Sequence, residues 1–208
     1  MNERKESIQP TDTYSIIFRR KGEPVQINYV RLMNLLDEAE SLCNARAFAS
    51  VISLRNPFSV CQRVYGYFTP LISGKTSFSV EKEKLSLPLK YTPPANCLIV
   101  SPETLVSIHH AAGEKFAGQS PSKQAKLKKA ETVGFKRKEL LAQNSKLPVG
   151  LRLNYFFLQK GLYSAVRKFF GKSFRTFLVD EGEIPAATKL FFEDAGFEIL
   201  QPEMWGKK

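Results

Sequence analysis

The stretch FRTFLVDEGEIPAATKLFFEDAGFEIL, residues 174–200, decides the fold predicted for this chain. Its first segment, Phe174–Val179, is almost entirely apolar and predicts a buried strand. Pro185 then starts a helix that ends at Gly196, because proline suits the first helical turn and glycine suits the position after the last turn. Phe197–Leu200 follows as a closing strand. This order predicts parallel strands joined by a helical crossover.

The residues just before this stretch extend the predicted unit. Leu151–Leu158 alternates along its length, with Leu151, Leu153, Tyr155 and Phe157 on one face, and this alternation predicts a further strand. A helix follows Gly161 and ends at Gly171. Residues 148–204 are therefore predicted to form a βαβαβ unit with a small parallel sheet.

Residues 11–112 have the pattern of a mixed, β-rich part with two helices. Asn28 can cap the first helix, whose apolar residues recur every three to four positions. Ser101 and Pro102 begin the second helix, over 102–112, which we expect to stop at Gly113. Alternating or apolar segments predict short strands at 14–18, 25–27, 47–54, 63–71, 77–80, 85–91 and 97–100.

A basic connector, residues 113–147, joins these two parts. Gly, Ser and Pro residues in 113–123 predict a loop, and 123–143 has helical propensity with a thin apolar stripe that Gly134 interrupts. The predicted class is therefore α+β: a mixed β-rich part over 11–112, a basic helical connector over 113–147 and the βαβαβ unit over 148–204. The first and last parts can merge into one domain.

Positive charge is concentrated in one segment of the chain. Residues 114–168 contain 13 Lys and Arg against 3 Asp and Glu, whereas the rest of the chain contains 18 basic and 17 acidic residues. The net charge of +11 thus comes almost wholly from this segment. A concentrated cationic surface indicates a polyanionic partner.

Our first hypothesis is a non-catalytic nucleic-acid-binding protein, with DNA and RNA both left open. Lysine and arginine bind phosphates through salt-sensitive counterion release, and an exposed aromatic ring can stack on an unpaired base. Phe156 is expected on the strand face opposite Tyr155, beside cations. The candidate contacts are Lys123, Lys126, Lys128, Lys129, Lys136, Arg137, Lys138, Arg152 and Phe156.

A second hypothesis is an inhibitor or adaptor that docks on a protein partner. The predicted helix at 29–45 carries Asp37, Glu38 and Glu40, so the chain presents an acidic surface as well as a basic one. In its small size and basic profile the chain is similar to fertility-inhibition proteins carried by conjugative plasmids. This resemblance implies docking on a nucleic-acid machine such as a conjugation ATPase, and the corresponding alternative function is a plasmid- or phage-type inhibitor or adaptor.

A third hypothesis is a metal-dependent nuclease. Asp180 and Glu183 follow the strand at 174–179, and Lys160 follows the strand at 151–158, so all three would meet at the carboxyl edge of a parallel sheet. Carboxylates beside a lysine can hold a divalent ion and stabilise a phosphodiester transition state. The simpler interpretation is that these carboxylates complement the N-terminus of the following helix.

Other motifs narrow the possible chemistry. Ser73–Thr76 ends like a phosphate-binding loop, but Thr69 stands where its first glycine is required, and a strand pattern follows. A helix-turn-helix over 130–143, with Gly134 in the turn, is a further alternative for DNA binding. His109 and His110 point about 100° apart on a helix, so they do not readily face one metal or substrate.

The remaining composition predicts a globular protein without bound cofactor or metal. Cys43, Cys61 and Cys97 are too few and too widely spaced for a zinc site or a disulfide framework, so we interpret them as structural thiols of a reducing compartment. No apolar run is long enough to span a bilayer, and the first residues lack the apolar segment of a secretory signal. We therefore expect a cytoplasmic protein.

Overall fold

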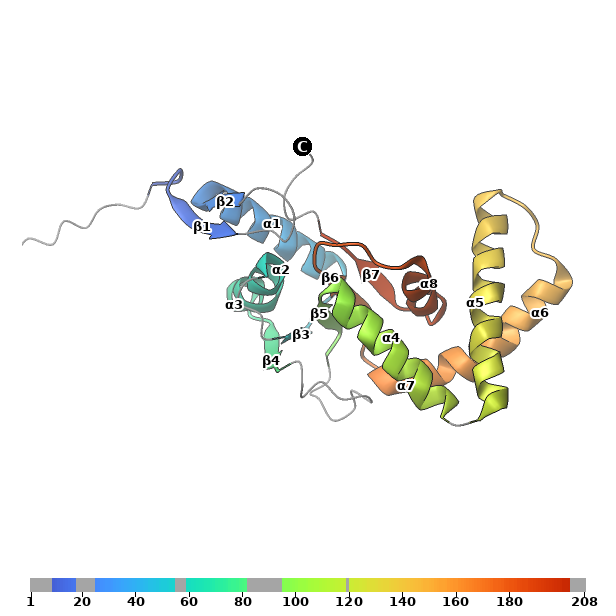
Figure 1. Cartoon of the computed structure of the whole chain (residues 1–208). Coiled ribbons are helices and arrows are strands. Elements are labelled where there is room, and N and C mark those ends of the chain that lie inside the picture. Colours follow the sequence, from blue (N-terminus) through green and yellow to red (C-terminus); the bar gives the residue numbers. More distant parts are fainter. Residues whose placement is uncertain (1–8, 18–24, 55–58, 82–94, 119, 203–208) are drawn as a thin grey trace, which may run out of the picture.

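A five-stranded parallel sheet forms the centre of the molecule, with the strand order β4-β3-β5-β6-β7 (Figure 1). The computed structural model describes residues 9–17, 25–54, 59–81, 95–118 and 120–202. A small antiparallel sheet pairs β1 with β2. The predicted α+β class is therefore confirmed. The strands are β1 Thr13–Ile17, β2 Val25–Asn28, β3 Ser50–Leu54, β4 Thr76–Val80, β5 Cys97–Val100, β6 Thr176–Val179 and β7 Glu198–Leu200.

Helices connect the parallel strands and cover both faces of the sheet (Figure 1). The helices are α1 Tyr29–Ala45, α2 Val60–Arg63, α3 Thr69–Ser73, α4 Pro102–Ala117, α5 Pro121–Ala142, α6 Val149–Leu158, α7 Ser164–Phe170 and α8 Ala186–Asp194. Two π-helical turns, η1 Val64–Phe68 and η4 Gln159–Tyr163, lie between helices.

The inner strands β5 and β6 are buried on both faces because alternate side chains enter two separate cores. Leu98 and Phe177 belong to a core shared with α4, α7 and α8. Ile99 and Leu178 belong to a second core shared with α1, α2 and η1. A strand buried on both sides has a continuous apolar sequence rather than an alternating one. This explains why β5 and β6 were predicted correctly from apolar runs.

Side-chain caps fix where the two well-predicted helices begin. The Asn28 side chain accepts a hydrogen bond from the Arg31 amide at the start of α1. The Ser101 hydroxyl accepts one from the Thr104 amide at the start of α4. Each cap satisfies an amide that has no partner within the helix, so both predicted helix starts are confirmed.

The larger core is built mainly from phenylalanine. Phe177 lies between Phe174 and Phe192, with ring centroids 4.9 and 4.7 Å from its own. Phe170 and Phe197 complete the cluster, at a centroid distance of 5.0 Å. Tilted and edge-on pairs of this kind add to the free energy gained by burying the rings. The three cysteines are free thiols in the interior, consistent with the structural role predicted for them.

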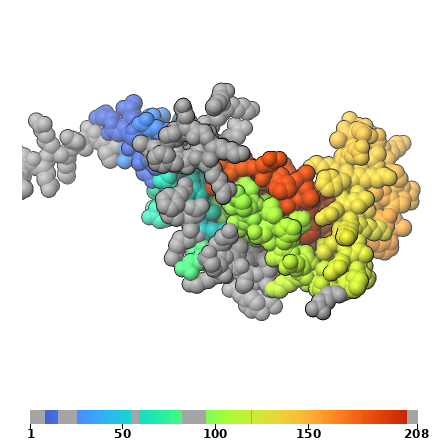
Figure 2. Space-filling view, in the orientation of Figure 1, coloured from blue at the N-terminus to red at the C-terminus, as the bar shows by residue number. Residues whose placement is uncertain are grey.

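Helices α5 and α6 pack against each other and extend away from the sheet (Figure 1). We refer to residues 121–158 as the arm. The space-filling view shows it as a lobe, in yellow to orange, at one end of the molecule (Figure 2). From α6 the chain continues through η4 into α7 and so returns to the sheet.

Two predicted strands are wrong. Leu151–Leu158 is not a strand but lies in α6, so the last part of the chain is a helical run followed by β6, α8 and β7. The same segment also fits a helical pattern, because Leu151, Tyr155 and Leu158 recur every three to four residues, and these side chains face inward. Residues 63–71 are likewise helical, so the first part has more helices than the two predicted.

The connector is more helical than its composition suggested. Helix α4 continues past Gly113 to Ala117 and ends at Gly118, whose φ of +52° favours glycine. Helix α5 runs through Gly134 without a break, which excludes the predicted helix-turn-helix. Gly134 is there for packing, because a Cβ atom would lie 2.6 Å from an Asp194 carboxylate oxygen. The strand predicted at 85–91 lies outside the described residues.

Candidate nucleic-acid interface

One buried carboxylate fixes the arm to the rest of the molecule. Asp194, at the end of α8, accepts hydrogen bonds from Tyr155 (3.1 Å) and Tyr163 (3.4 Å) and pairs with Arg137 at 3.2 Å. Gln159 donates to the Asp194 main-chain carbonyl at 2.6 Å. Burial raises the pKa of the Asp194 carboxyl, although these hydrogen bonds and Arg137 act in the opposite direction. The position of the arm therefore depends on polar contacts.

Five of the predicted lysines project from α5 without a carboxylate partner. They are exposed, and within the described residues none forms an ion pair: Lys123, Lys126, Lys128, Lys129 and Lys136. At 100° per residue, Lys126, Lys129 and Lys136 fall on one side of the helix. Lys123 lies over the Phe116 ring, with its Nζ 5.9 Å from the centroid. These ammonium groups are available to a partner.

The other two basic residues predicted on α5 have partners in α8. Arg137 contacts the buried Asp194 and also lies over the Tyr155 ring, 4.3 Å from its centroid. Lys138 lies 3.6 Å from the Glu193 carboxylate. Both contacts join α5 to α8, but only the contact of Arg137 involves a buried carboxylate, and the exposed pair of Lys138 contributes little to stability. Sequence reasoning missed this because Asp194 is 57 residues from Arg137.

The outer side of α6 combines exposed rings with cations. Phe156 is 48% exposed, and the Lys160 Nζ lies 4.4 Å from its ring centroid. Arg152, one turn earlier on the same side, is also exposed. Phe156 was expected on a strand, and α6 instead presents it from a helix. The predicted juxtaposition of an open ring with positive charge nevertheless exists there.

The same side of α6 is strongly apolar. Val149, Leu153 and Phe157 are 79%, 55% and 62% exposed. The inner side, by contrast, faces α5 and α8 through Leu151, Tyr155 and Leu158. Clustered large apolar side chains in contact with water mark interaction surfaces more often than inert ones.

The nuclease hypothesis placed Lys160, Asp180 and Glu183 together at the carboxyl edge of the sheet, and the structure does not support this placement for Lys160. Lys160 follows helix α6 rather than a strand, and its ammonium group lies over Phe156. Asp180 and Glu183 do lie between β6 and α8, where Asp180 accepts a hydrogen bond from the Glu181 amide. The described residues contain no group of three acidic, histidine or cysteine side chains that could hold a metal ion.

The two histidines occupy different surroundings. His109 packs against Phe191 with the two rings tilted by 36°, at a centroid distance of 4.3 Å, and its Nδ1 lies 3.1 Å from the Thr188 hydroxyl. Burial lowers the pKa of His109 to about 4, and the neighbouring His110 contributes to this shift. His110 is exposed. His109 is thus a neutral packing residue between α4 and α8.

Comparison with known proteins gives no independent guide to function. The chain matches no protein-family model, no curated protein and no solved structure. No helix in the described part of the chain combines the length and apolar character needed to cross a bilayer.

Proposed function

We propose that this protein binds nucleic acid without catalysis, through the phosphate backbone and the lysines of α5. The observation that carries the proposal is the set of exposed lysines on the arm, from Lys123 to Lys136, that have no carboxylate partner among the described residues. Positive charges that the protein does not neutralise itself attract polyanions and release their counterions.

The spacing of these lysines suits a phosphate backbone. Lys123 and Lys136 are 13 residues apart on α5, which corresponds to about 20 Å along the helix axis. Lys126, Lys129 and Lys136 fall on one side within that length, so several phosphates of one strand can be reached together. Contacts of this kind position the protein without reading base sequence.

Phe156 adds a contact suited to unpaired bases. Its exposed ring lies beside Lys160 and Arg152 on α6, so a base stacked on it would have cations close to its flanking phosphates. Stacking of this kind contributes roughly 1–3 kcal/mol per base and tolerates any base. The arm therefore favours single-stranded segments over a closed duplex.

The test compares two double variants with the same loss of charge. Lys129→Gln with Lys136→Gln removes two of the α5 cations, and Lys75→Gln with Lys189→Gln removes two cations elsewhere. Fluorescence anisotropy with single strands of about 20 nucleotides, at roughly 50 to 200 mM salt, measures affinity and its salt dependence. We expect the α5 variant to bind at least about tenfold more weakly, with a salt slope smaller by about 2.

The control variant should bind as the natural chain does. Equal affinity of all three proteins for single- and double-stranded DNA and RNA would exclude the arm as the binding surface. Arg137 is unsuitable for this test, because its loss would disturb the contact with Asp194 as well as remove charge.

A protein partner is the second candidate, favoured by the apolar outer side of α6. The exposed Val149, Leu153 and Phe157 offer a surface that a partner can desolvate, and Arg152 and Lys160 at its margin suit a partner with acidic side chains. An inhibitor or adaptor acting on a nucleic-acid machine, such as a conjugation ATPase, would use such a surface.

Photocrosslinking separates this candidate from the first. A photoreactive residue at position 153 in the full chain should give a discrete adduct in bacterial cells that resists nuclease and is destroyed by protease. The same residue at position 75 should give none. An adduct at position 153 that nuclease removes would contradict the protein-partner hypothesis and support nucleic-acid binding.

A further inference from the structure

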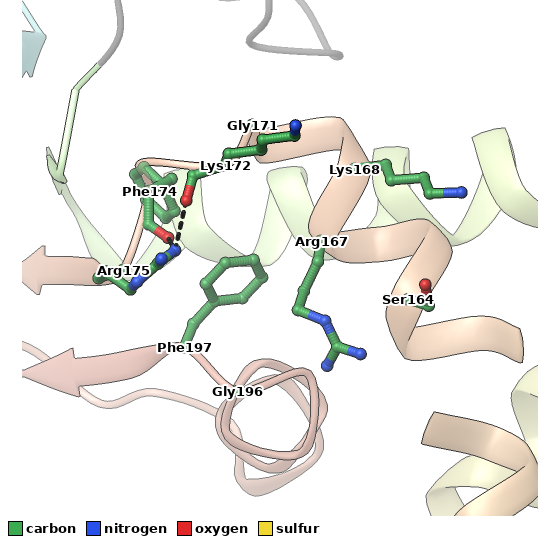
Figure 3. Close-up of a pocket in the computed structure, with 9 residues that line it drawn as sticks. All are labelled: Ser164, Arg167, Lys168, Gly171, Lys172, Phe174, Arg175, Gly196 and Phe197. Carbon is green, nitrogen blue, oxygen red and sulfur yellow. Dashed lines mark hydrogen bonds between the residues drawn. The ribbon is translucent and has the colours of Figure 1, made fainter. Parts of the chain in front are cut away.

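A cavity of about 680 Å³ lies between α7 and the beginnings of β6 and β7, on the side of the sheet where these strands start (Figure 3). Its wall includes Arg167, Lys168, Lys172 and Arg175. The residues lining it include no Asp or Glu. A cavity of this size with four cations and no acid is a site for an anion.

Among the described residues, no acidic side chain neutralises these cations. Arg175 donates to two main-chain carbonyls of the described residues, those of Lys172 at 2.7 Å and Phe174 at 2.8 Å. Figure 3 shows these two bonds, with Lys168 and Lys172 extending from the end of α7 and its following turn.

Arg167 is held in place and keeps part of its hydrogen-bonding capacity. Its Nη1 donates to the Ala195 carbonyl at 2.9 Å and to the Gln159 side chain at 3.1 Å, and its Nη2 donates to the Gln159 carbonyl at 3.3 Å. A guanidinium has five N–H donors, so two are not used by these bonds. A fixed arginine with unused donors loses little freedom when it binds a phosphate.

The base of the cavity is apolar. Phe197 and Phe174 line it with the small parts of their surfaces that stay exposed, 5% and 1%, and Gly171 and Gly196 leave space beside them, each with a φ of +87°. No neighbouring atom lies within 4 Å of a Cβ placed on Gly171. Inorganic phosphate would fill only a small part of this volume, so the carbon part of a larger ligand can contact the rings.

We propose that this cavity binds an organic phosphate of mononucleotide size that carries at least two negative charges. The phosphate would accept hydrogen bonds from Arg167, while Lys168 and Lys172 would add positive charge at the opposite side, and the remainder of the ligand would lie against Phe197. This site is separate from the lysines of α5 and does not depend on nucleic-acid binding by the arm. The same chemistry is offered by a free nucleotide and by the 5′-phosphorylated end of a strand.

Calorimetric titration of the full chain with AMP, ATP and inorganic phosphate tests the proposal. We expect AMP and ATP to bind more tightly than inorganic phosphate, and we expect Lys168→Gln with Lys172→Gln to weaken both at least about tenfold. Arg167→Lys, which keeps the charge but loses the planar donors, should weaken them as well. Lys75→Gln with Lys189→Gln, which removes two cations outside the cavity and the arm, is the matched control and should leave nucleotide binding unchanged.

Competition against bound AMP separates the two sources of the ligand. Displacement by a 5′-phosphorylated but not by a 5′-hydroxyl oligonucleotide assigns the cavity to strand ends, and displacement by neither assigns it to free nucleotides. The proposal is overturned if AMP and ATP bind no better than inorganic phosphate. It is also overturned if the Lys168 and Lys172 double variant binds them normally, or if the control variant loses binding equally.

Discussion

The sheet and the arm are held in place by different forces. Around the sheet, strands such as β5 and β6 are buried on both faces, and large side chains such as Phe177 have no contact with water. In α5, by contrast, only Ala130, Val133 and Gly134 are buried. The sheet is thus stabilised by apolar burial, whereas the arm combines a smaller apolar contact, through Ala130, Val133 and Leu158, with polar contacts to Asp194.

This difference suits a division of roles between the two regions. A helix with a thin apolar side leaves most of its circumference available for charged residues, and α5 uses that circumference for lysines. The sheet cannot carry such a surface without losing the burial that stabilises it. The substitutions below therefore should affect the two regions differently.

The largest effect on the free energy of unfolding is expected from a substitution in the core beside the sheet. Phe177→Ala removes a fully buried ring that contacts Phe174 and Phe192, and should lower the free energy of unfolding by about 4 kcal/mol. Urea denaturation followed by circular dichroism measures this change. A loss confined to the arm, with the sheet unaffected, would contradict the view that this core stabilises the whole molecule.

A smaller, local effect is expected where the arm joins α8. Asp194→Ala leaves the buried Tyr163 hydroxyl and Arg137 without their acceptor, which should cost about 3 kcal/mol. Hydrogen exchange should show protection falling first in 121–158, while β5 and β6 retain theirs. Lys138→Gln, which removes only an exposed contact with Glu193, is the control and should change little. Uniform loss of protection would show that the arm is not a separate unit.

Acid should destabilise the contact between α4 and α8. Burial lowers the pKa of His109 to about 4, whereas the unfolded chain has the ordinary value near 6.5. Below pH 6.5 the unfolded state takes up a proton that the folded state does not, so stability is full above pH 6.5 and falls until about pH 4.

The expected loss across that window is on the order of 2 kcal/mol, allowing for partial solvent contact. His109→Gln should remove this part of the pH dependence of thermal unfolding, and His110→Gln, at an exposed position, should not. Parallel pH profiles for the natural chain and His109→Gln would show that His109 titrates normally.

The smallest effect on stability is expected on the outer side of α6. Phe156→Ala removes an exposed ring and should change the free energy of unfolding by less than about 0.5 kcal/mol. Its affinity for single-stranded nucleic acid should nevertheless fall by about 1–3 kcal/mol. Leu151→Ala, on the inner side, is the contrasting control because it should affect stability more than binding. Unchanged affinity in Phe156→Ala would exclude stacking on this ring.

The sequence predicted the sheet better than the arm, for a physical reason. Cys97–Val100 and Thr176–Val179 are short apolar runs followed by helix-starting signals, and local chemistry was sufficient to assign them. For 151–158 the alternating and the helical patterns both fitted the residues. The helix packs through Leu151, Tyr155 and Leu158, and the tertiary contacts of these residues, such as that of Tyr155 with Asp194, are distant in sequence.

The candidate site could also be predicted only in part from the sequence. The concentration of lysine could be counted directly, and the exposure of Phe156 beside cations could be anticipated from its neighbours. The sequence could not show which cations pair with carboxylates of the protein itself. Arg137 and Lys138 do so, and their partners lie in α8. The cavity beside α7 also could not be anticipated, since its cations come together with Phe197 only after β6 and β7 pair.

The wide turn at 159–163 also sets the direction in which α6 presents its outer side. A π-helical turn holds one residue more than an α-helical turn, and each residue rotates the helix by about 100°. The exposed Gly161 has no atom within 4 Å of where its Cβ would lie, so the extra residue is accommodated without crowding. Deleting Gly161 would rotate Phe156 by roughly a quarter of a revolution relative to α7. The one extra residue of this turn therefore determines how the outer side of α6 is rotated relative to α7 and the sheet.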